Sequence, residues 1–134
     1  MDNKERLQLK EKYQREIEAD LNSYKAVMSG EMKALKSTVW ATPWALLSSA
    51  EITKYMLNDI AHFNVDEIPS KVKYSTFRST KLVGMLHMLF EDKLYNAIDN
   101  AYPGKWNEYD MTRLPRHHWD KESNLQAFLD RKSV

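Results

Sequence analysis

The stretch YQREIEADLNSYKAVMSGEMKALKS, residues 13–37, carries its apolar side chains on one face of a helix. These side chains recur every three or four residues, which is the period of an amphipathic α-helix and not the alternation of a strand. The stripe consists of Ile17, Leu21, Tyr24, Val27 or Met28, and Leu35. The residues before it are mixed in charge and contain no proline. We therefore predict one long N-terminal helix over residues 3–37.

This apolar stripe has two interpretations. It either packs against the rest of its own domain or meets the same stripe of a second copy. The stripe spans only about two and a half heptads, which is short for a coiled coil. We favour packing within the domain and keep a homodimer through the helix at 13–37 as the alternative.

Downstream of residue 37, the apolar spacing predicts three or four shorter helices. They cover residues 49–63, 81–90, 91–102 and 121–132, the second and third being either separate or continuous through a bend. Ser48 followed by Glu51 has the spacing of a capping box and is expected to open the first of them. A connector with Trp40, Pro43 and Trp44 precedes that helix. The fold class expected from these patterns is all-α.

Single residues mark the other helix ends. Ser79 or Thr80 is expected to begin the helix over 81–90, and Pro103-Gly104 is expected to stop the one over 91–102. Asp120 is expected to cap the last helix. The loop between the helices at 49–63 and 81–90 contains the sequence NVDEIPSKV.

Length and composition exclude several classes of protein. A chain of 134 residues fits one domain, here residues 1–134. The sequence has no cysteine, which excludes disulfides, thiolate metal sites and cysteine nucleophiles. Its longest uncharged run, STVWATPWALLSSA, is too short and too polar to span a bilayer. We expect a soluble cytoplasmic protein, located in the host cytoplasm if it is encoded by a phage, with no membrane partner.

The segment SKVKYSTFRSTK, residues 70–81, is the best functional candidate. It contributes four bases, and no acid occurs between Pro69 and Phe90. Bases interleaved with hydroxyls and aromatic rings suit contact with phosphates. Together with two arginines of the tail, the predicted nucleic-acid-binding residues are Lys71, Lys73, Arg78, Lys81, Arg113 and Arg116. The alternative is a solvated basic loop beside a core helix.

The C-terminal half carries a series of short motifs in a fixed order. They are Leu82–Leu86, Ala97, Tyr102-Pro103, Trp106, Leu114-Pro115, Trp119, Asn124 and Phe128-Leu129. This series, over residues 68–131, resembles an uncharacterised repeat of algal, oomycete and large-virus proteins and of related phage and bacterial proteins. The chain departs from the repeat at Tyr109, where another aromatic is usual, and at Arg131-Lys132, which replace Trp-Leu. Relatives of the repeat adjoin zinc-ribbon or endonuclease-like modules, so the resemblance implies work near nucleic acid.

The prolines and tryptophans of this tail are expected to form a structural clamp. Proline fixes the backbone, and a large aromatic neighbour buries much area with few rotatable bonds. Tyr102-Pro103, Trp106, Pro115 and Trp119 would thus hold an irregular connector onto short helices. The alternative is a platform on which bases stack, which needs exposed ring faces.

Three further patterns resemble catalytic or metal sites only weakly. His117-His118 have no third ligand at helical spacing, so we expect no metal there. Glu91 and Asp92 in FEDKLY echo metal-dependent nucleases, but they suit the first turn of a helix better. His62 and His87 are expected at the surface or core edge of amphipathic helices. We expect no catalytic residue and no cofactor.

The leading hypothesis is a small non-catalytic regulatory protein of phage or mobile-element type that binds nucleic acid through its basic segment. The second is a protein-binding inhibitor or adaptor that acts on a host or defence enzyme. It would use the long helix and exposed aromatics around Trp40 and Trp44. A metal-dependent nuclease is a remote third.

Overall fold

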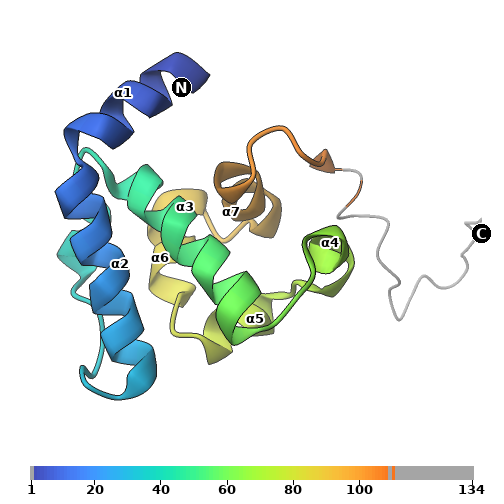
Figure 1. Cartoon of the computed structure of the whole chain (residues 1–134). Helices are drawn as coiled ribbons and strands as arrows, with labels where there is room; N and C mark the ends of the chain where they lie inside the picture. The colour runs from blue at the N-terminus through green and yellow to red at the C-terminus, as the bar shows by residue number, and fades with distance from the viewer. Residues whose placement is uncertain (1, 109, 111–134) are drawn as a thin grey trace, which may run out of the picture.

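The computed structural model describes residues 2–108 and 110, and Figure 1 shows that the regular elements among them are helices. This part of the chain forms seven α-helices, two short 3-10 helices and one π-helical turn, with no strand. The all-α class is therefore confirmed. No helix within it is long and apolar enough to cross a bilayer. The expected helix over 121–132 and its cap Asp120 lie outside the described residues.

The helix predicted over 3–37 is two shorter helices, α1 (Asn3–Lys12) and α2 (Gln14–Ser29). They meet at Tyr13, which has φ −111° and ψ 25° and so leaves helical geometry. The ring of Tyr13 packs on Trp44 with 4.8 Å between centroids, and this contact fixes the bend. At the other end, Gly30 adopts φ 92°, a left-handed conformation that stops a helix and is easy only for glycine. Residues 31–36 consequently lie outside any helix.

The apolar stripe of α2 packs inside its own domain. Ile17, Tyr24 and Val27 are buried, and α2 lies along α3 (Ala45–Tyr55) (Figure 1). The ring of Tyr24 meets Tyr55 of α3 edge-on with 6.1 Å between centroids. Packing within the domain is thus the correct interpretation of the stripe. A homodimer through residues 13–37 cannot use these buried side chains without unfolding the helix pair.

Helix α3 begins at Ala45 with Trp44 at its N-cap, so the predicted start at Ser48 is wrong. Ser48 is buried inside the helix, and its hydroxyl donates a hydrogen bond to the Asp20 carboxylate at 2.7 Å. The indole N–H of Trp44 donates to the same oxygen at 3.0 Å. A tertiary contact with α2 therefore takes the hydroxyl that the local capping pattern would have used. The preceding connector forms a 3-10 helix, η1 (Ser37–Ala41).

Helix α3 continues into a π-helical turn, η2 (Met56–Ile60). The N–H of Ala61 donates to the carbonyl of Met56 at 2.8 Å, a spacing one residue wider than in an α-helix. His62 ends the element with φ 58°, so this histidine terminates the helix and does not lie within it. The end of the helix expected at 49–63 is close to that prediction, whereas its start is four residues too late.

The segment expected to be a loop between residues 64 and 81 is largely helical. It forms η3 (Val65–Glu67), α4 (Ile68–Lys71) and α5 (Tyr74–Ser79). Ser79 and Thr80 finish α5 and do not begin the next helix, because the Thr80 hydroxyl donates back to the carbonyl of Thr76 at 2.7 Å.

The last two helices in the described range are α6 (Val83–Phe90) and α7 (Leu94–Ala101). Glu91 and Asp92 separate them with φ values of 52° and 63°, so these acids form a left-handed turn and not the first turn of a helix. Tyr102 caps α7, and Pro103-Gly104 follows, as predicted.

The core sits between α3 and its neighbours α2, α6 and α7 (Figure 1). Its largest fully buried side chains are Tyr24, Phe77, Ile52, Met56, Leu57, Ile68, Leu82, Met85, Leu86 and Ile98. Trp40 of η1 is also buried, with 7% of its surface exposed. Helix α1 contributes no buried residue and extends away from this body.

Candidate nucleic-acid interface

We define the basic segment as residues 71–81, which bear four of the predicted cations. Lys71 ends α4, Lys73 precedes α5, Arg78 lies in the last turn of α5, and Lys81 occupies the turn into α6. All four side chains are exposed. The structure therefore brings them onto one stretch of short helices. Arg113 and Arg116 lie outside the described residues, as do His117 and His118.

The four cations differ in their partners. The Lys71 ammonium lies 3.1 Å from the Glu67 carboxylate. The hydrogen bond from Lys71, joined by one from the backbone N–H of Asn64, lowers the pKa of Glu67. Within the described residues, Lys73, Arg78 and Lys81 form no ion pair with a carboxylate. Lys71 is thus the weakest candidate for a phosphate, because its charge is already balanced.

Arg78 is held in place by its own helix. Its guanidinium carbon lies 5.2 Å from the centroid of the Tyr74 ring, four residues earlier. This cation–π contact limits the positions of the guanidinium, and the Arg78 side chain remains exposed. A guanidinium in this arrangement can donate two hydrogen bonds to one phosphate.

The basic segment stands on a rigid base. Val72, Phe77 and Leu82 are buried in the main core. The hydroxyl of Tyr24 on α2 donates a buried hydrogen bond to the carbonyl of Thr80 at 2.9 Å. The two residues are 56 positions apart in the sequence. Burial raises the pKa of Tyr24, so this hydroxyl keeps its proton. The cations are therefore presented by a fixed backbone.

A groove that sequence reasoning missed lies beside the basic segment. Its lining comes from the end of η2 and from α5, and its volume is about 420 Å³. The lining residues are Ile60, Ala61, Phe63, Ser75, Thr76, Ser79 and Thr80. The hydroxyls of residues 70–81 were visible in the sequence. Their apolar counterpart was not, because the turn at His62 that brings η2 against α5 has no glycine to mark it.

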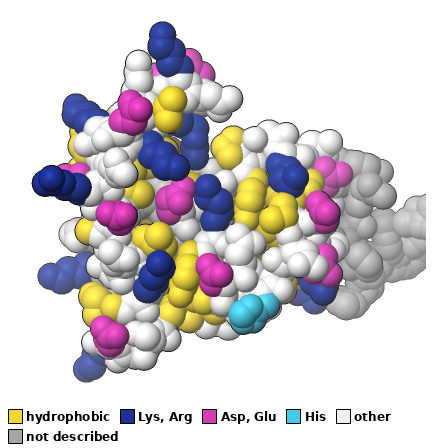
Figure 2. Space-filling model, in the orientation of Figure 1, with side chains coloured by type: hydrophobic (Ala, Val, Ile, Leu, Met, Phe, Trp, Pro, Cys, Tyr) yellow, Lys and Arg dark blue, Asp and Glu magenta, His cyan; other side chains and the backbone are white. Residues whose placement is uncertain are grey.

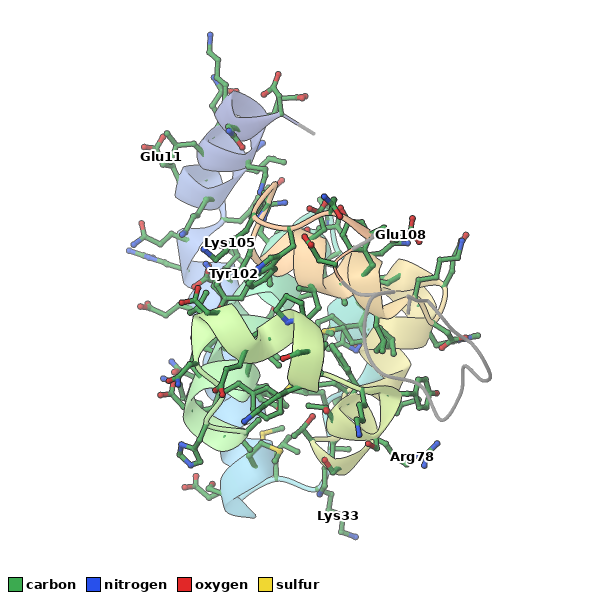
Figure 3. The ribbon with its side chains drawn as sticks, turned by 90° about the vertical axis from the view of Figure 1, so that its right-hand side faces the viewer. Glu11, Lys33, Arg78, Tyr102, Lys105 and Glu108 are labelled. Carbon is green, nitrogen blue, oxygen red and sulfur yellow. The ribbon has the colours of Figure 1, made fainter. Side chains whose placement is uncertain are left out.

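The wider surface shows where other charges lie. Lys33, from the segment after α2, projects from the same end of the molecule as Arg78 (Figure 3). On the face drawn in Figure 2, basic and acidic side chains are interspersed and not gathered by sign. The molecule as a whole is not strongly basic, because its net charge is only +1. The basic segment is thus distinguished by the absence of acids from its own stretch of sequence.

The aromatics around η1 do not form an exposed patch. Trp40 is buried, and Trp44 is half-buried between the Tyr13 ring and the Asp20 carboxylate. The expectation of exposed aromatics around Trp40 and Trp44 is therefore wrong. Trp40 belongs to the core cluster, and Trp44 contacts the Tyr13 ring and the Asp20 carboxylate.

A second groove, of about 260 Å³, lies under α1. Leu7 of α1 lines it and is 59% exposed. Ile17, Leu47 and Ala101 form apolar parts of its lining, and Lys10 and Lys54 bring charge to it. Both ammonium groups pair with Glu51, at 3.6 and 3.2 Å.

The first half of the aromatic clamp is present. The rings of Tyr102 and Trp106 meet edge-on with 5.5 Å between centroids, and the Tyr95 hydroxyl donates to the carbonyl of Trp106 at 3.3 Å. Burial, together with the nearby carboxylate of Asp99, raises the pKa of Tyr95. Both clamp rings pack against the core, as the structural interpretation predicts. Pro115 and Trp119 lie outside the described residues.

The remaining candidate residues are exposed and paired. His87 lies on α6 with its Nδ1 3.1 Å from the Asp92 carboxylate. Glu91 lies 3.6 Å from Lys93. Residues 2–108 and 110 contain no group of three histidines or carboxylates that could hold a metal ion.

Comparison with known proteins gives one match. No curated protein and no solved structure matches the chain. Residues 21–107 match the model of a family described as proteins of unknown function, DUF4046. The matched range includes the second half of α2, from residue 21 on, and the whole basic segment, whereas α1 precedes it. Because the match spans more than half of the 134 residues, the chain belongs to the DUF4046 family.

Proposed function

We propose that this protein is a small non-catalytic regulatory protein that binds nucleic acid through the basic segment. The observation that carries the proposal is the set of exposed cations at Lys73, Arg78 and Lys81, which pair with no described carboxylate. No acid occurs in the sequence from Pro69 to Phe90, so the local field is positive. Residues 68–131 resemble a repeat of algal, oomycete and large-virus proteins and of related phage and bacterial proteins, and a phage or mobile-element origin is compatible with that resemblance.

The binding mode follows from the chemistry of these side chains. Lysine and arginine contacts to phosphates release counterions, so affinity falls steeply as salt increases. The order of importance should be Arg78 and Lys81 first, then Lys73, with Lys71 last because Glu67 balances its charge. Arg113 and Arg116 would add contacts from the tail.

The test is a charge reversal at two exposed positions. Arg78→Glu with Lys81→Glu should weaken binding of a labelled oligonucleotide by at least about tenfold and reduce the salt slope by about two. Fluorescence anisotropy between low and physiological salt measures both. The matched control, Lys4→Glu with Arg15→Glu, changes one lysine and one arginine at exposed sites of α1 and α2.

The control variant distinguishes phosphate contact by the basic segment from a general effect of the protein's net charge. If both double variants bind as the parent does, the proposal is wrong. If both weaken binding equally, net charge and not the basic segment drives association. Circular dichroism of each variant confirms that its helices remain.

A second candidate is a protein-binding inhibitor or adaptor that acts on a host or defence enzyme. The observation that favours it is the groove under α1, where Leu7 is 59% exposed and the lining mixes apolar residues with charged ones. Its partner would bind with little salt dependence, and Leu7→Glu would abolish the complex while leaving oligonucleotide binding intact.

A further inference from the structure

The groove between η2 and α5 has two walls of different chemistry. One wall is apolar and consists of Ile60, Ala61 and Phe63, each half-buried. The opposite wall is a row of hydroxyls on α5, at Ser75, Thr76, Ser79 and Thr80. The volume of about 420 Å³ falls in the range of small-ligand sites. Such a groove suits a flat ring that is apolar on its face and polar at its edge.

The hydroxyl row retains hydrogen-bonding capacity toward the groove. Thr80 and Ser79 donate to the carbonyl of Thr76, at 2.7 and 3.3 Å, so their oxygens still accept. The Thr76 hydroxyl oxygen accepts from the Lys73 N–H at 3.0 Å and can still donate its own proton. The wall therefore offers both donors and acceptors to a polar edge.

The charge around the groove is one-sided. Helix α5 carries no acid, and its one cation, Arg78, projects from a different face of the helix than the lining residues. Acidic side chains belong to the other wall and the turn behind it, at Asp59 of η2 and Asp66 of η3. An anionic chain would thus follow α5 and avoid η2, and a ring attached to that chain would have to reach across α5 to enter the groove.

We propose that this groove receives an unpaired nucleobase of a single strand whose phosphates contact the basic segment. The inference rests on the proposed function and names the form of nucleic acid. In a duplex both faces of a base are covered by stacking and its edge is paired, so only an unpaired or extruded base can enter such a groove. A single strand should therefore bind more tightly than a duplex of the same length and sequence.

The experiment uses four labelled 20-nucleotide probes with the full chain: single-stranded DNA, single-stranded RNA, duplex DNA and a DNA strand of abasic sites. The abasic strand keeps the phosphates and removes the rings. The expected result is single-strand binding about 5- to 150-fold tighter than abasic binding, the range set by stacking of one base. Duplex binding should resemble abasic binding.

A groove-filling variant tests the location. Ser75→Leu places an aliphatic side chain in the groove from an exposed position on α5, adds no ring for stacking and leaves every cation in place. It should remove the single-strand preference and leave abasic binding unchanged. The control Asn22→Leu makes a similar exposed change on α2, outside the groove, and should behave as the parent.

The outcomes distinguish the two proposals. Equal binding of single, abasic and duplex strands, with Ser75→Leu unchanged, would retain phosphate contact and overturn the base site. A single-strand preference that survives Ser75→Leu would also overturn this location. No salt-dependent binding of any probe would overturn the proposed function and the base site together. Thermal unfolding of Ser75→Leu near the parent's melting temperature shows that the variant is folded.

Discussion

Helices α1 and α2 follow each other in the chain and are attached to the protein by different means. Helix α2 buries Ile17, Tyr24 and Val27 against the core, whereas α1 buries no residue. Helix α1 is held by Arg6, whose guanidinium donates to the side-chain oxygen and the carbonyl of Asn100, each at 3.0 Å. One helix is thus fixed by burial of apolar surface and the other by part-buried polar contacts.

The difference shows which property of the sequence determines packing. Both helices are rich in mixed charges, and both read as helical from propensity alone. Only α2 repeats apolar residues at helical spacing over its whole length. The family match begins at residue 21, so it includes the second half of α2 and none of α1. The following variants test how far the two attachments differ.

The largest effect is expected from Tyr24→Ala. Tyr24 is fully buried and also holds the carbonyl of Thr80. Removing the ring should lower the free energy of unfolding by about 3–5 kcal/mol, as for other large-to-small core changes. The matched change Tyr13→Ala, at the half-buried junction of α1 and α2, should cost only about 1 kcal/mol. Urea unfolding measures both, and equal losses would contradict the comparison.

A smaller effect is expected from Tyr24→Phe, which removes only the buried hydroxyl. The unpaired carbonyl of Thr80 should cost about 1–3 kcal/mol at pH 7. Burial raises the pKa of Tyr24, so the parent loses stability as pH rises above the unfolded tyrosine value of about 10. The phenylalanine variant has no such proton to lose. The difference in the free energy of unfolding between parent and variant should therefore become smaller from pH 7 to pH 11, as measured by denaturant titrations. A constant difference would contradict the raised pKa of the buried Tyr24 hydroxyl.

The smallest effect is expected from Arg6→Ala. It removes both part-buried hydrogen bonds to Asn100 and should lower the free energy of unfolding by about 1 kcal/mol. Amide hydrogen exchange should become faster in α1 and stay slow in α2. Helix α1 has no buried side chain that would keep it packed once the two hydrogen bonds are lost. Arg15→Ala, at an exposed site on α2, is the control. Faster exchange in both helices would show that α1 supports α2.

Sequence reasoning predicted the fold class and the face of α2, since these depend on apolar periodicity. It missed the break at Tyr13, because the contact that bends the chain comes from Trp44, 31 positions away. It misplaced the start of α3 because Asp20, on another helix, takes the hydroxyl of Ser48. Turns through His62, Glu91 and Asp92 were invisible, since left-handed backbone at such residues has no compositional signal.

The candidate site was predictable in its charges and not in its shape. The four cations of the basic segment stand together in the sequence, and the structure keeps all four exposed. Pairing of Lys71 with Glu67 follows from their four-residue spacing, although α4 was expected to be a loop. The groove beside α5 needs the π-helical turn and the path of the chain after it, neither of which the local pattern encodes.

The backbone at Lys81 has a consequence for how this chain can evolve. Lys81 adopts φ 64°, a conformation that costs a residue other than glycine about 1 kcal/mol. Lys81→Gly would remove that strain and make the turn between α5 and α6 easier to form. A chain selected for stability alone would drift toward glycine at this position. Under the proposed function, such a drift would discard one of the cations that pair with no described carboxylate. Selection for a stable fold and selection for binding would then oppose each other at a single codon.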